Sequence, residues 1–528
     1  MKDKILSGLI PMRSSRSVHS RAVRAASFFL AAVLAACAGK FLCSCTSNSS
    51  GSSAPVSVLQ YHNGARRDGV YVDSTLTKAS AATFHTDPAF KAEIHGAIYA
   101  QLLYVAGGAK GKDIIIAVTE ENNVAALDAG TGKTVWSRNL GAPVPLRNLP
   151  CGNINPLGIT GTPVIDMASR RIFLDAMTTP DRGITRKHLV FALSIEDGST
   201  LSGWPVDVSA TVTSGNTAFD SSVQNQRGAL AFVKGKVYVS YGGHYGDCGR
   251  YHGWLVGIPA DKPNAPKAWA TGAPGGGSWA PGGVASENGV IFISTGNTFG
   301  ITAWAGGNAL LRFGPGPVFS GKAADYFTPG NWKELDEDDL DLGSTGPIIL
   351  DMPGSRPSKL LVALGKDGKI YLVDRANLGG VGNQVAVAEV AANAIIGAAA
   401  VYTTLLGTYV VFKGNGRHCP AGRSGDLTAV RIVPGAPPTV RTAWCAKQNG
   451  KGSPMVTTTD GHAEAIVWSV GAEGDNRLHG FDGDTGQIVY AGGGPADVIG
   501  PVRRYQTPIL AGGRIFIAAD NAVKAFVR

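Results

Sequence analysis

The sequence is poor in charge and lacks the short motifs that mark several large enzyme classes. Charged side chains make up 16% of its 528 residues, too few for a protein built mainly from solvated helices. It has no P-loop, no Gly-x-Ser-x-Gly elbow and no Rossmann glycine pattern at a strand–helix junction, so nucleotide-binding and serine-hydrolase chemistry have no support. Cys-x-x-Cys-His is also absent, which excludes covalently attached c-type haem.

Turn-forming residues are abundant instead. The chain has 71 glycines and 29 prolines, a composition that favours one large all-β unit over several helical domains. Its formal net charge is +9, but six basic residues and one acidic residue within the first 36 positions supply +5 of it. The remaining positive charge is weak and scattered, so we expect no nucleic-acid partner.

The N-terminal region has the layout of an export signal. Basic residues precede the apolar run Ala25–Ala36, which is too short to span a bilayer. The run ends in Leu-Ala-Ala-Cys37, which resembles a bacterial lipobox, although ordinary signal cleavage nearby is the alternative and Met12 is an equally good start. We therefore expect residues 1–36 to be removed and Cys37 to carry a lipid.

The residues after Cys37 read as a spacer. The stretch Thr46–Ser53 is rich in serine, and we expect residues 37–57 to form a flexible tether between the lipid and a folded domain at 58–528. On this reading the protein is an exported lipoprotein of the periplasm or cell surface, in contact with the membrane through its lipid anchor alone.

Four of the seven cysteines lie in the predicted domain: Cys151, Cys248, Cys419 and Cys445. An even number in an oxidising compartment predicts disulfides. We expect Cys419 to pair with Cys445, close in sequence across a hairpin, and Cys151 with Cys248, although sequence alone does not fix the connectivity.

Short β-rich runs bounded by Gly, Asp and Asn recur about every forty to fifty residues, which is the period of a propeller blade. Typical strands are Asp113–Val118, Lys236–Ser240, Val290–Ser294 and Arg514–Ala518. We predict an all-β, eight-bladed propeller with four-stranded antiparallel blades, the last completed by residues near 80–93 so that no edge strand is left open. The predicted blades are approximately 94–140, 158–208, 226–272, 283–322, 345–381, 398–446, 452–493 and 504–528.

The first predicted blade ends in Ala126-Leu-Asp128-Ala-Gly-Thr131-Gly132-Lys133-Thr-Val-Trp136. This segment resembles, at every specified position, the Ala-x-Asp-x-x-Thr-Gly-Lys-x-x-Trp docking motif of quinoprotein propellers. Asp128 and Thr131 are expected to bond within a tight turn, Gly132 to take a positive φ, and Trp136 to pack between blades. Weaker echoes occur at Asp482–Tyr490 and before Trp204, Trp269 and Trp444, and we interpret all of them as structural.

A second stretch resembles the cofactor-binding region of pyrroloquinoline quinone (PQQ) alcohol dehydrogenases. Gly275-Gly-Gly-Ser-Trp279 is followed eighteen residues later by Asn297 in Ser-Thr-Gly-Asn, and Asp341 lies where the family places its catalytic Asp. The hairpin Gly365-Lys366-Asp-Gly matches one whose basic residue contacts the quinone oxygens.

The resemblance implies a role for each of these residues. Trp279 would stack beneath a planar quinone, Asn297 and Asp341 would bind calcium, and Lys366 would stabilise negative charge on the quinone oxygens. Asp341 would also act as general base on a substrate hydroxyl. The further candidates are Arg227 and His244 for the cofactor and Asp247 for the metal.

The match to the family is incomplete. The adjacent Cys-Cys pair of many such enzymes is absent, and their carboxylate calcium ligand has no clear counterpart, Asp247 being the nearest substitute. Asp247 also lies in a group with His244, Cys248 and His252 that suggests a transition-metal site as an alternative. Each residue also has a purely structural interpretation. Trp279 could pack between blades and Asn297 could form a turn. Lys366 could lie at an exposed hairpin tip, and Asp341 could belong to a solvated acidic loop.

Two functions from different classes follow. The first is a PQQ- and calcium-dependent dehydrogenase that oxidises an alcohol or sugar and passes electrons to an external acceptor. The second is a non-catalytic propeller lipoprotein that serves as a scaffold or binding protein for an envelope partner, as in outer-membrane assembly lipoproteins with similar repeats. A weaker third is glycan or peptide binding through the loops Tyr241–Trp254 and Asn297–Trp304.

Overall fold

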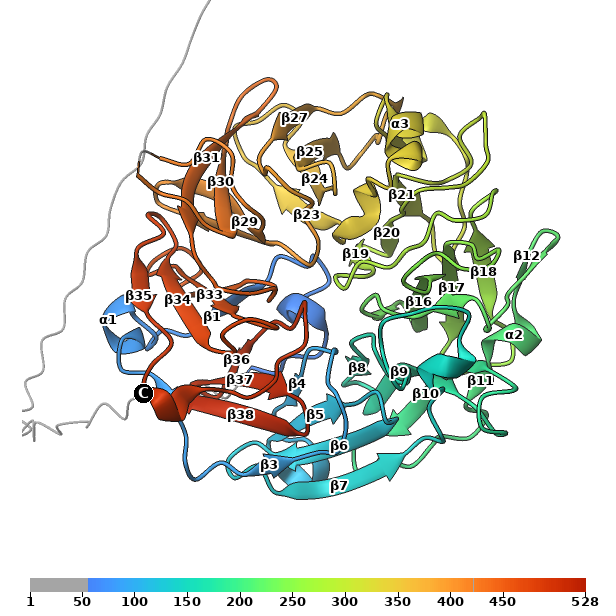
Figure 1. Cartoon of the computed structure of the whole chain (residues 1–528), viewed down its shortest axis with the longest axis horizontal. Coiled ribbons are helices and arrows are strands. Elements are labelled where there is room, and N and C mark those ends of the chain that lie inside the picture. The colour runs from blue at the N-terminus through green and yellow to red at the C-terminus, as the bar shows by residue number, and fades with distance from the viewer. Residues whose placement is uncertain (1–55, 421) are drawn as a thin grey trace, which may run out of the picture. The chain divides into compact units, whose positions relative to one another are not determined.

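The computed structural model describes residues 56–420 and 422–528 (Figure 1). The predicted signal, Cys37 and most of the predicted tether lie outside the described residues. These described residues belong to one compact unit. In that unit eight β-sheets follow one another around a ring, in the order of the sequence, which confirms the predicted eight blades (Figure 1).

Blades one to four are each built around antiparallel strands. Blade one consists of β4 (Leu103–Val105), β5 (Ile114–Val118), β6 (Asn123–Asp128) and β7 (Thr134–Asn139), and blade two of β8 (Val164–Asp166), β9 (Arg171–Thr178), β10 (Lys187–Ser194) and β11 (Val206–Asp207). Blade three consists of β14 (Gln224–Asn225), β15 (Ala231–Val233), β16 (Lys236–Gly243), β17 (Trp254–Pro259) and β18 (Lys267–Ala270). Blade four consists of β19 (Ala285–Glu287), β20 (Val290–Ser294), β21 (Leu310–Phe313), β22 (Tyr326–Thr328) and β26 (Gly380–Val381).

Blades five to eight continue the ring. Blade five consists of β23 (Ile348–Asp351), β24 (Lys359–Leu364), β25 (Lys369–Asp374) and β27 (Ala386–Glu389), and blade six of β28 (Ala400–Thr404), β29 (Gly407–Lys413), β30 (Leu427–Val433) and β31 (Thr439–Ala446). Blade seven consists of β1 (Val70–Val72), β32 (Met455–Thr458), β33 (Ile466–Val470), β34 (Leu478–Asp482) and β35 (Ile488–Tyr490). Blade eight consists of β36 (Ile509–Ala511), β37 (Arg514–Ala519), β38 (Ala522–Val527), β2 (His85–Thr86) and β3 (Ala92–Glu93).

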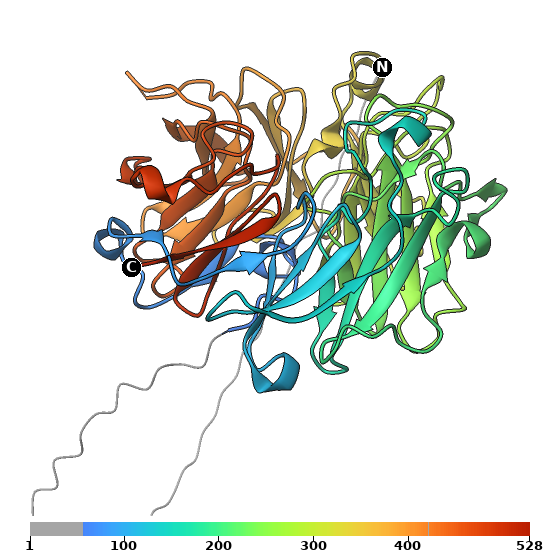
Figure 2. The same ribbon diagram turned by 60° about the horizontal axis from the view of Figure 1, so that its bottom comes forward.

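Outside these sheets the described chain consists mainly of turns and loops with a few short elements. A small hairpin pairs β12 (Thr213–Ser214) with β13 (Thr217–Ala218), and the α-helices are α1 (Lys78–Ala81), α2 (Val208–Thr211) and α3 (Trp332–Glu337). No helix in the described residues is both long and apolar enough to cross a membrane. Loops gather at the two ends of the ring, as the turned view shows (Figure 2).

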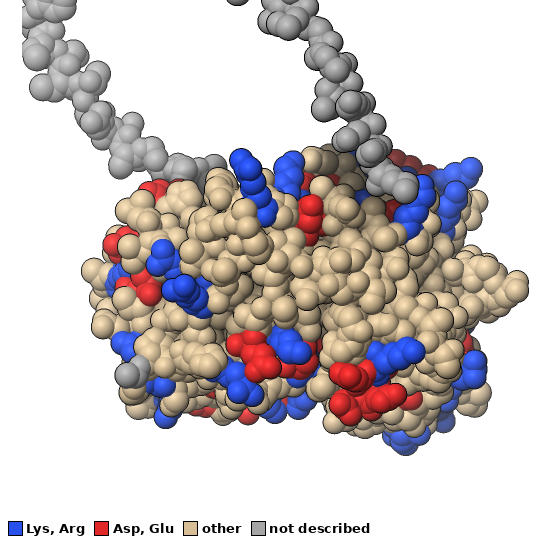
Figure 3. All heavy atoms as spheres, turned by 90° about the horizontal axis from the view of Figure 1, so that it is seen from above, with Lys and Arg blue, Asp and Glu red and all other residues tan. Residues whose placement is uncertain are grey.

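The middle strands of the blades are buried on both faces because each blade packs between two others. All five residues of β5 (Ile-Ile-Ile-Ala-Val) are buried, as are most of those in β16, β20 and β37. Such continuous β-branched runs are typical of strands covered on both sides. On the outer face shown in Figure 3, basic and acidic side chains are interspersed and most of the surface carries neither, as the low charged fraction of the sequence implies.

Two predicted blade boundaries are wrong. Blade four was expected to end near 322, but β22 lies beyond it, and β26 adds to the same sheet through parallel pairing with β22. Blade five was expected to end near 381, whereas its outermost strand is β27. The chain crosses back to the earlier blade between β25 and β27, and no local turn pattern marks that excursion.

The last blade is completed by an N-terminal segment, as predicted. β2 and β3 both pair antiparallel with β38, with Thr86 opposite Phe526 and Ala92 opposite Val523. The ring is therefore closed by strands from both ends of the described chain, and the edge of β38 is covered.

Residues 58–73, which we call the axial segment, contact blades one to seven, a feature that the sequence did not indicate. Its backbone oxygens accept N–H groups from the inner strands of successive blades, and Val70–Val72 pair parallel with β32. Arg67 is 1% exposed, and its side chain donates hydrogen bonds to the backbone oxygens of Leu230 and Val284, which directly precede β15 and β19. The backbone bonds link Val58 to Tyr104, Leu59 to Ile165, Ala65 to Ser286, Arg66 to Ile349, Asp68 to Val401 and Gly69 to Val456.

The docking turn, defined as Asp128–Trp136, has the structure its residues predict. One oxygen of Asp128 accepts the N–H groups of Gly130 and Thr131 and the Thr131 hydroxyl. Gly132 has φ +79°, and a Cβ there would lie 2.5 Å from the backbone of Lys91. The buried indole of Trp136 donates its N–H to the oxygen of Ile195 in the next blade at 2.8 Å, so the turn fixes one blade against another.

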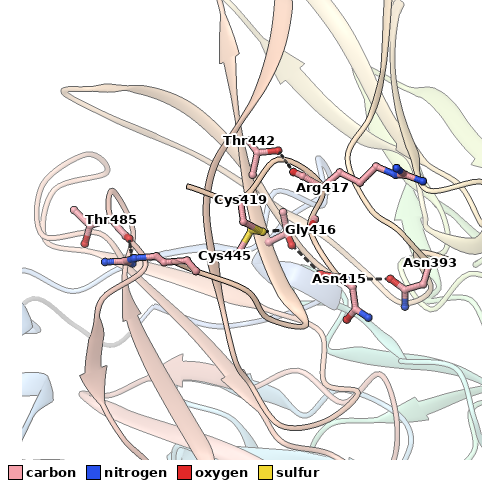
Figure 4. Close-up of a disulfide and its surroundings, with 11 residues drawn as sticks. Asn393, Asn415, Gly416, Arg417, Cys419, Thr442, Cys445 and Thr485 are labelled. Atoms are coloured by element: carbon pink, nitrogen blue, oxygen red, sulfur yellow. Dashed lines mark hydrogen bonds between the residues drawn. A yellow bond between two sulfur atoms is a disulfide. The ribbon is translucent and has the colours of Figure 1, made fainter. Parts of the chain in front are cut away.

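Both predicted disulfides are present. Cys419 pairs with Cys445 within blade six (Figure 4), and Cys151 pairs with Cys248 between loops that precede blade two and lie within blade three. Close to the first pair, Thr442 donates to the backbone oxygen of Arg417, which adds a second tie across the same loop (Figure 4).

Candidate functional site

The structure brings together four residues that the sequence singled out. Trp279 lies in the loop between β18 and β19, and Asn297 follows β20. Asp341 follows α3, and Lys366 lies in the turn between β24 and β25. The loops come from neighbouring blades, and their ends converge because successive inner strands run side by side around the ring. We call these four residues the polar cluster.

Asp341 is the centre of the polar cluster. Its Oδ1 accepts the backbone N–H of Asn297 at 2.7 Å, and its Oδ2 lies 2.6 Å from the Lys366 ammonium. The Lys366 nitrogen in turn lies 5.6 Å from the centroid of the Trp279 ring. Gly296 makes this approach possible, since a Cβ at that position would lie 2.1 Å from Asp341 Oδ1 and 3.3 Å from the indole nitrogen of Trp279.

The turn that carries Lys366 is fixed by its backbone. The Lys366 N–H donates to the backbone oxygen of Asp341 at 2.9 Å, so the two residues are joined through main chain and side chain. Gly368 takes φ +74°, and a Cβ there would lie 2.5 Å from the oxygen of Ala391. Lys366 therefore does not behave as a free hairpin tip: its side chain is 16% exposed and directed into the cluster.

Asp339 is a member of this environment that the sequence did not single out. Its Oδ1 lies 2.8 Å from Lys366 Nζ, so the ammonium bridges a buried and an exposed carboxylate. Burial opposes the charge of Lys366, but Asp341 and Asp339 outweigh that effect and raise its pKa. Burial raises the pKa of Asp341, an effect that Lys366 partly offsets. The only sequence signal was the acidic run Glu334–Asp341, which does not say which carboxylate turns inward.

These residues fit a planar quinone. Trp279 is half-buried and presents a ring, which suits stacking against a flat heterocycle. Lys366, beside that ring, offers hydrogen-bond donors for carbonyl or carboxylate oxygens.

They do not fit a calcium ion. Calcium takes six to eight oxygen ligands, and of the predicted set only Asn297 and Asp341 lie in the polar cluster, with Asp341 Oδ2 already bound to Lys366. Asp247, the third predicted ligand, is exposed and accepts the Tyr251 hydroxyl at 2.6 Å. Within residues 56–420 and 422–528, no group of three or more His, Cys, Asp and Glu side chains is arranged to hold a metal.

The residues of the alternative transition-metal site are held in other interactions. Cys248 is bound to Cys151, which removes the one soft ligand. His252 bonds through Nδ1 to the backbone oxygen of Thr271 at 3.0 Å. His244 is buried, and burial together with neighbouring cationic groups lowers its pKa to about 4. The structure thus places His244 beside the disulfide loop rather than in contact with the polar cluster.

Arg227 lies in a hollow at the inner ends of several blades, whose lining includes Tyr61, Tyr99, Asn153 and Arg504. Its Nη2 is 3.5 Å from Asn153 Oδ1, and its buried Nε has no protein acceptor in the described structure. Among the described interactions, Arg227 makes no hydrogen bond or ion pair with the polar cluster, but Pro281, two residues after Trp279, lines the same hollow.

Glu120 is a buried carboxylate near Arg227 that the sequence reading did not select. It is 1% exposed, its Oε2 accepts the Gly158 N–H at 2.7 Å, and its Oε1 has no protein partner in the described structure. Burial raises its pKa to about 7, although the Gly158 bond, Thr160, Arg227 and Arg503 act in the opposite direction. Its position two residues after the buried strand β5 is the sequence feature that could have marked Glu120 as a candidate.

Comparisons with known proteins show the fold. No protein-family model matches the chain, and no curated protein matches it in sequence. Among solved structures it is similar to a quinohemoprotein alcohol dehydrogenase from Pseudomonas putida HK5, with TM-score 0.62 and 12% identity over 89% of this chain and 80% of that one.

Two further solved structures give the same result. A quinohemoprotein alcohol dehydrogenase from Comamonas testosteroni has TM-score 0.59 and 14% identity, covering 89% of this chain and 80% of that one. A europium-containing methanol dehydrogenase has TM-score 0.59 and 13% identity, covering 88% and 89%. The chain therefore has the eight-bladed propeller fold of quinoprotein alcohol and methanol dehydrogenases.

Proposed function

We propose that this protein is an exported quinoprotein dehydrogenase that binds a planar quinone of the PQQ class against Trp279. In this proposal it oxidises a small alcohol or sugar and passes the electrons to an external acceptor. The fold and the dehydrogenase names of its structural neighbours support the class, and calcium is left out because the polar cluster does not fit it.

One observation carries the proposal. Trp279, Asn297, Asp341 and Lys366 lie far apart in the sequence and on separate loops, yet they make a chain of contacts from the indole ring through the ammonium to the carboxylate and the Asn297 backbone. A propeller that needs only blade packing has no use for a mostly buried Asp–Lys pair beside a half-buried indole, since burying charges is costly.

Each residue has a defined task in this proposal. When bound, the quinone supplies the two-electron acceptor. Trp279 holds its plane, and Lys366 donates to its oxygens and stabilises the negative charge that develops there. Asp341, oriented by the Asn297 N–H, accepts the proton of the substrate hydroxyl.

The experiment is cofactor retention. Residues 54–528, which form one compact unit, are mixed with PQQ and desalted, and cofactor absorbance and dye reduction over an alcohol and sugar panel are measured. We expect about one PQQ per chain, lost in Trp279→Ala and Asp341→Ala, with Asp128→Ala as a control at a carboxylate outside the site. Absence of retention in folded protein would contradict the proposal.

Export rests on separate support. Both disulfides join cysteines of the propeller, which agrees with an oxidising compartment. The lipid anchor at Cys37 is part of the proposal, and its test is the loss of fatty-acid labelling and of membrane association in Cys37→Ala.

A scaffold function is the second candidate, and one observation favours it. Asp341 and Lys366 satisfy each other without any ligand, so the polar cluster is stable when empty. A folded protein that retains no quinone but co-purifies with an envelope protein from detergent-solubilised membranes would support this candidate.

A further inference from the structure

We infer that Lys366 supplies the positive charge of this site in place of a metal ion, so that the quinone is bound and polarised by an ammonium group. This inference rests on the proposed function for its catalytic part, while its statement about cation binding holds for the protein without cofactor.

The ammonium of Lys366 is already paired with two carboxylates of the protein. Asp341 Oδ2 and Asp339 Oδ1 lie 2.6 and 2.8 Å from Nζ. The other oxygen of Asp341 accepts the Asn297 N–H. A divalent cation would have to displace the ammonium from Asp341 and Asp339, and beyond these two carboxylates it would gain only Asn297 and waters, fewer protein ligands than calcium takes.

The position of the ammonium is set by the fold. The Lys366 backbone is bound to Asp341, and its side chain is mostly covered, so the ammonium cannot swing into solvent without breaking two carboxylate contacts. Two of the three N–H donors of a lysine ammonium are directed to Asp339 and Asp341. The third is available for an oxygen of a molecule that lies on the Trp279 ring.

This arrangement has a chemical consequence. A metal ion at a carbonyl oxygen acts as a Lewis acid, whereas an ammonium donates a hydrogen bond and a full charge to the same atom. Lys366 can therefore stabilise developing charge on a quinone oxygen while Asp341 remains close enough to receive a proton. The ligand class that suits the site is a planar molecule with a carbonyl or carboxylate oxygen over the indole.

The test uses terbium as a probe for a hard cation, because Trp279 lies close enough to sensitise its luminescence. Apo-protein of residues 54–528 is titrated with terbium and, in competition, with calcium. We expect no saturable terbium site in the wild type and a new saturable site in Lys366→Met, since the unpaired Asp341 and Asp339 carboxylates then attract the ion. Lys366→Met/Asp341→Asn should lose the new site.

Lys369→Met is the matched control, because Lys369 also pairs with an aspartate, Asp367, at 3.5 Å but lies outside the polar cluster. It should gain no site. Thermal unfolding checks each variant, and Lys366→Gln replaces the methionine variant if that one fails to fold.

The outcomes separate the two proposals. A wild-type terbium site that Asp341→Asn abolishes would overturn the inference, as would the lack of any gain in folded Lys366→Met. PQQ retention that survives EDTA supports it, and retention that requires calcium overturns it. If wild type binds neither PQQ nor terbium while Lys366→Met gains terbium, the proposed function fails and the statement about Lys366 as resident cation stands.

Discussion

The docking turn and the polar cluster use the same kinds of residue in opposite ways. Each contains an aspartate, a glycine in close contact and a tryptophan. In the docking turn, Asp128 is satisfied by backbone N–H groups two and three residues away, and its tryptophan is buried against the next blade. In the polar cluster, Asp341 is buried and satisfied by residues from other loops, and its tryptophan is only half-buried.

The difference teaches how to separate structure from function in a repeat protein. A turn whose polar groups are satisfied locally stabilises the fold, and it can recur from blade to blade. A buried charge satisfied only over long range opposes folding by its desolvation, so its presence calls for a role other than stability. The predictions below test that contrast, from the largest effect to the smallest.

Trp136 and Trp279 should differ most. Trp136→Ala removes a buried indole and its bond to Ile195, and we expect it to lower the free energy of unfolding by about 3–5 kcal/mol. Trp279→Ala removes a half-buried ring and should cost less, about 2 kcal/mol. Urea unfolding measures both, and equal losses would erase the contrast.

The pH dependence of stability should come from an interior carboxylate rather than from the docking turn. The pKa of Glu120 in the folded protein is raised from 4.5 to about 7, so the unfolded chain loses its proton first as pH rises. The free energy of unfolding should therefore fall between about pH 4.5 and 7, by up to about 3 kcal/mol. Glu120→Gln should flatten that fall.

Asp128 contributes a pH dependence of stability with the opposite sign. Partial burial acts to raise its pKa, but bonds from Lys112 and Thr131 outweigh it, so the folded pKa is lowered. Its contribution to stability is present above its unfolded pKa and is lost as pH falls through the folded value. Asp128→Asn should therefore lower stability at neutral pH, and its difference from the wild type should shrink as pH falls through the folded pKa. If Glu120→Gln kept the full fall in stability between about pH 4.5 and 7, the assignment of that fall to Glu120 would be contradicted.

The two glycines of the docking turn should not be equivalent. Gly132→Ala combines a positive φ with a contact of 2.5 Å to the Lys91 backbone, and we expect a loss of about 1–2 kcal/mol. Gly130 has no positive φ, and an alanine Cβ there would lie 3.4 Å from Asp128, an ordinary contact. Gly130→Ala should change stability by less than about 0.5 kcal/mol in thermal unfolding.

The sequence predicted what is local or periodic. The docking turn, the eight repeats and the closure by residues near 80–93 all follow from turn chemistry and strand period. The axial segment was missed because residues 58–73 bond to blades through backbone oxygens, which leave no pattern in side chains. The bounds of blades four and five were missed because β26 pairs back to β22 across a long excursion.

The site was predictable in part. The resemblance to PQQ alcohol dehydrogenases pointed to Trp279, Asn297, Asp341 and Lys366, and the fold brings them into one cluster. The resemblance did not show that Asp339 is the second partner of Lys366, because any member of an acidic run could have turned inward. Nor did it show that Asp247 bonds to Tyr251, since that contact depends on the path of a glycine-rich loop.

The most direct test of the central claim is a fluorescence titration of residues 54–528 with PQQ in the presence of EDTA. The account predicts one binding site per chain, with affinity reduced at least about tenfold in Trp279→Phe and Lys366→Met but unchanged in Lys369→Met. Binding that is indifferent to Trp279 and Lys366, or no binding by the folded wild-type protein, would contradict the assignment of a quinone site to the polar cluster.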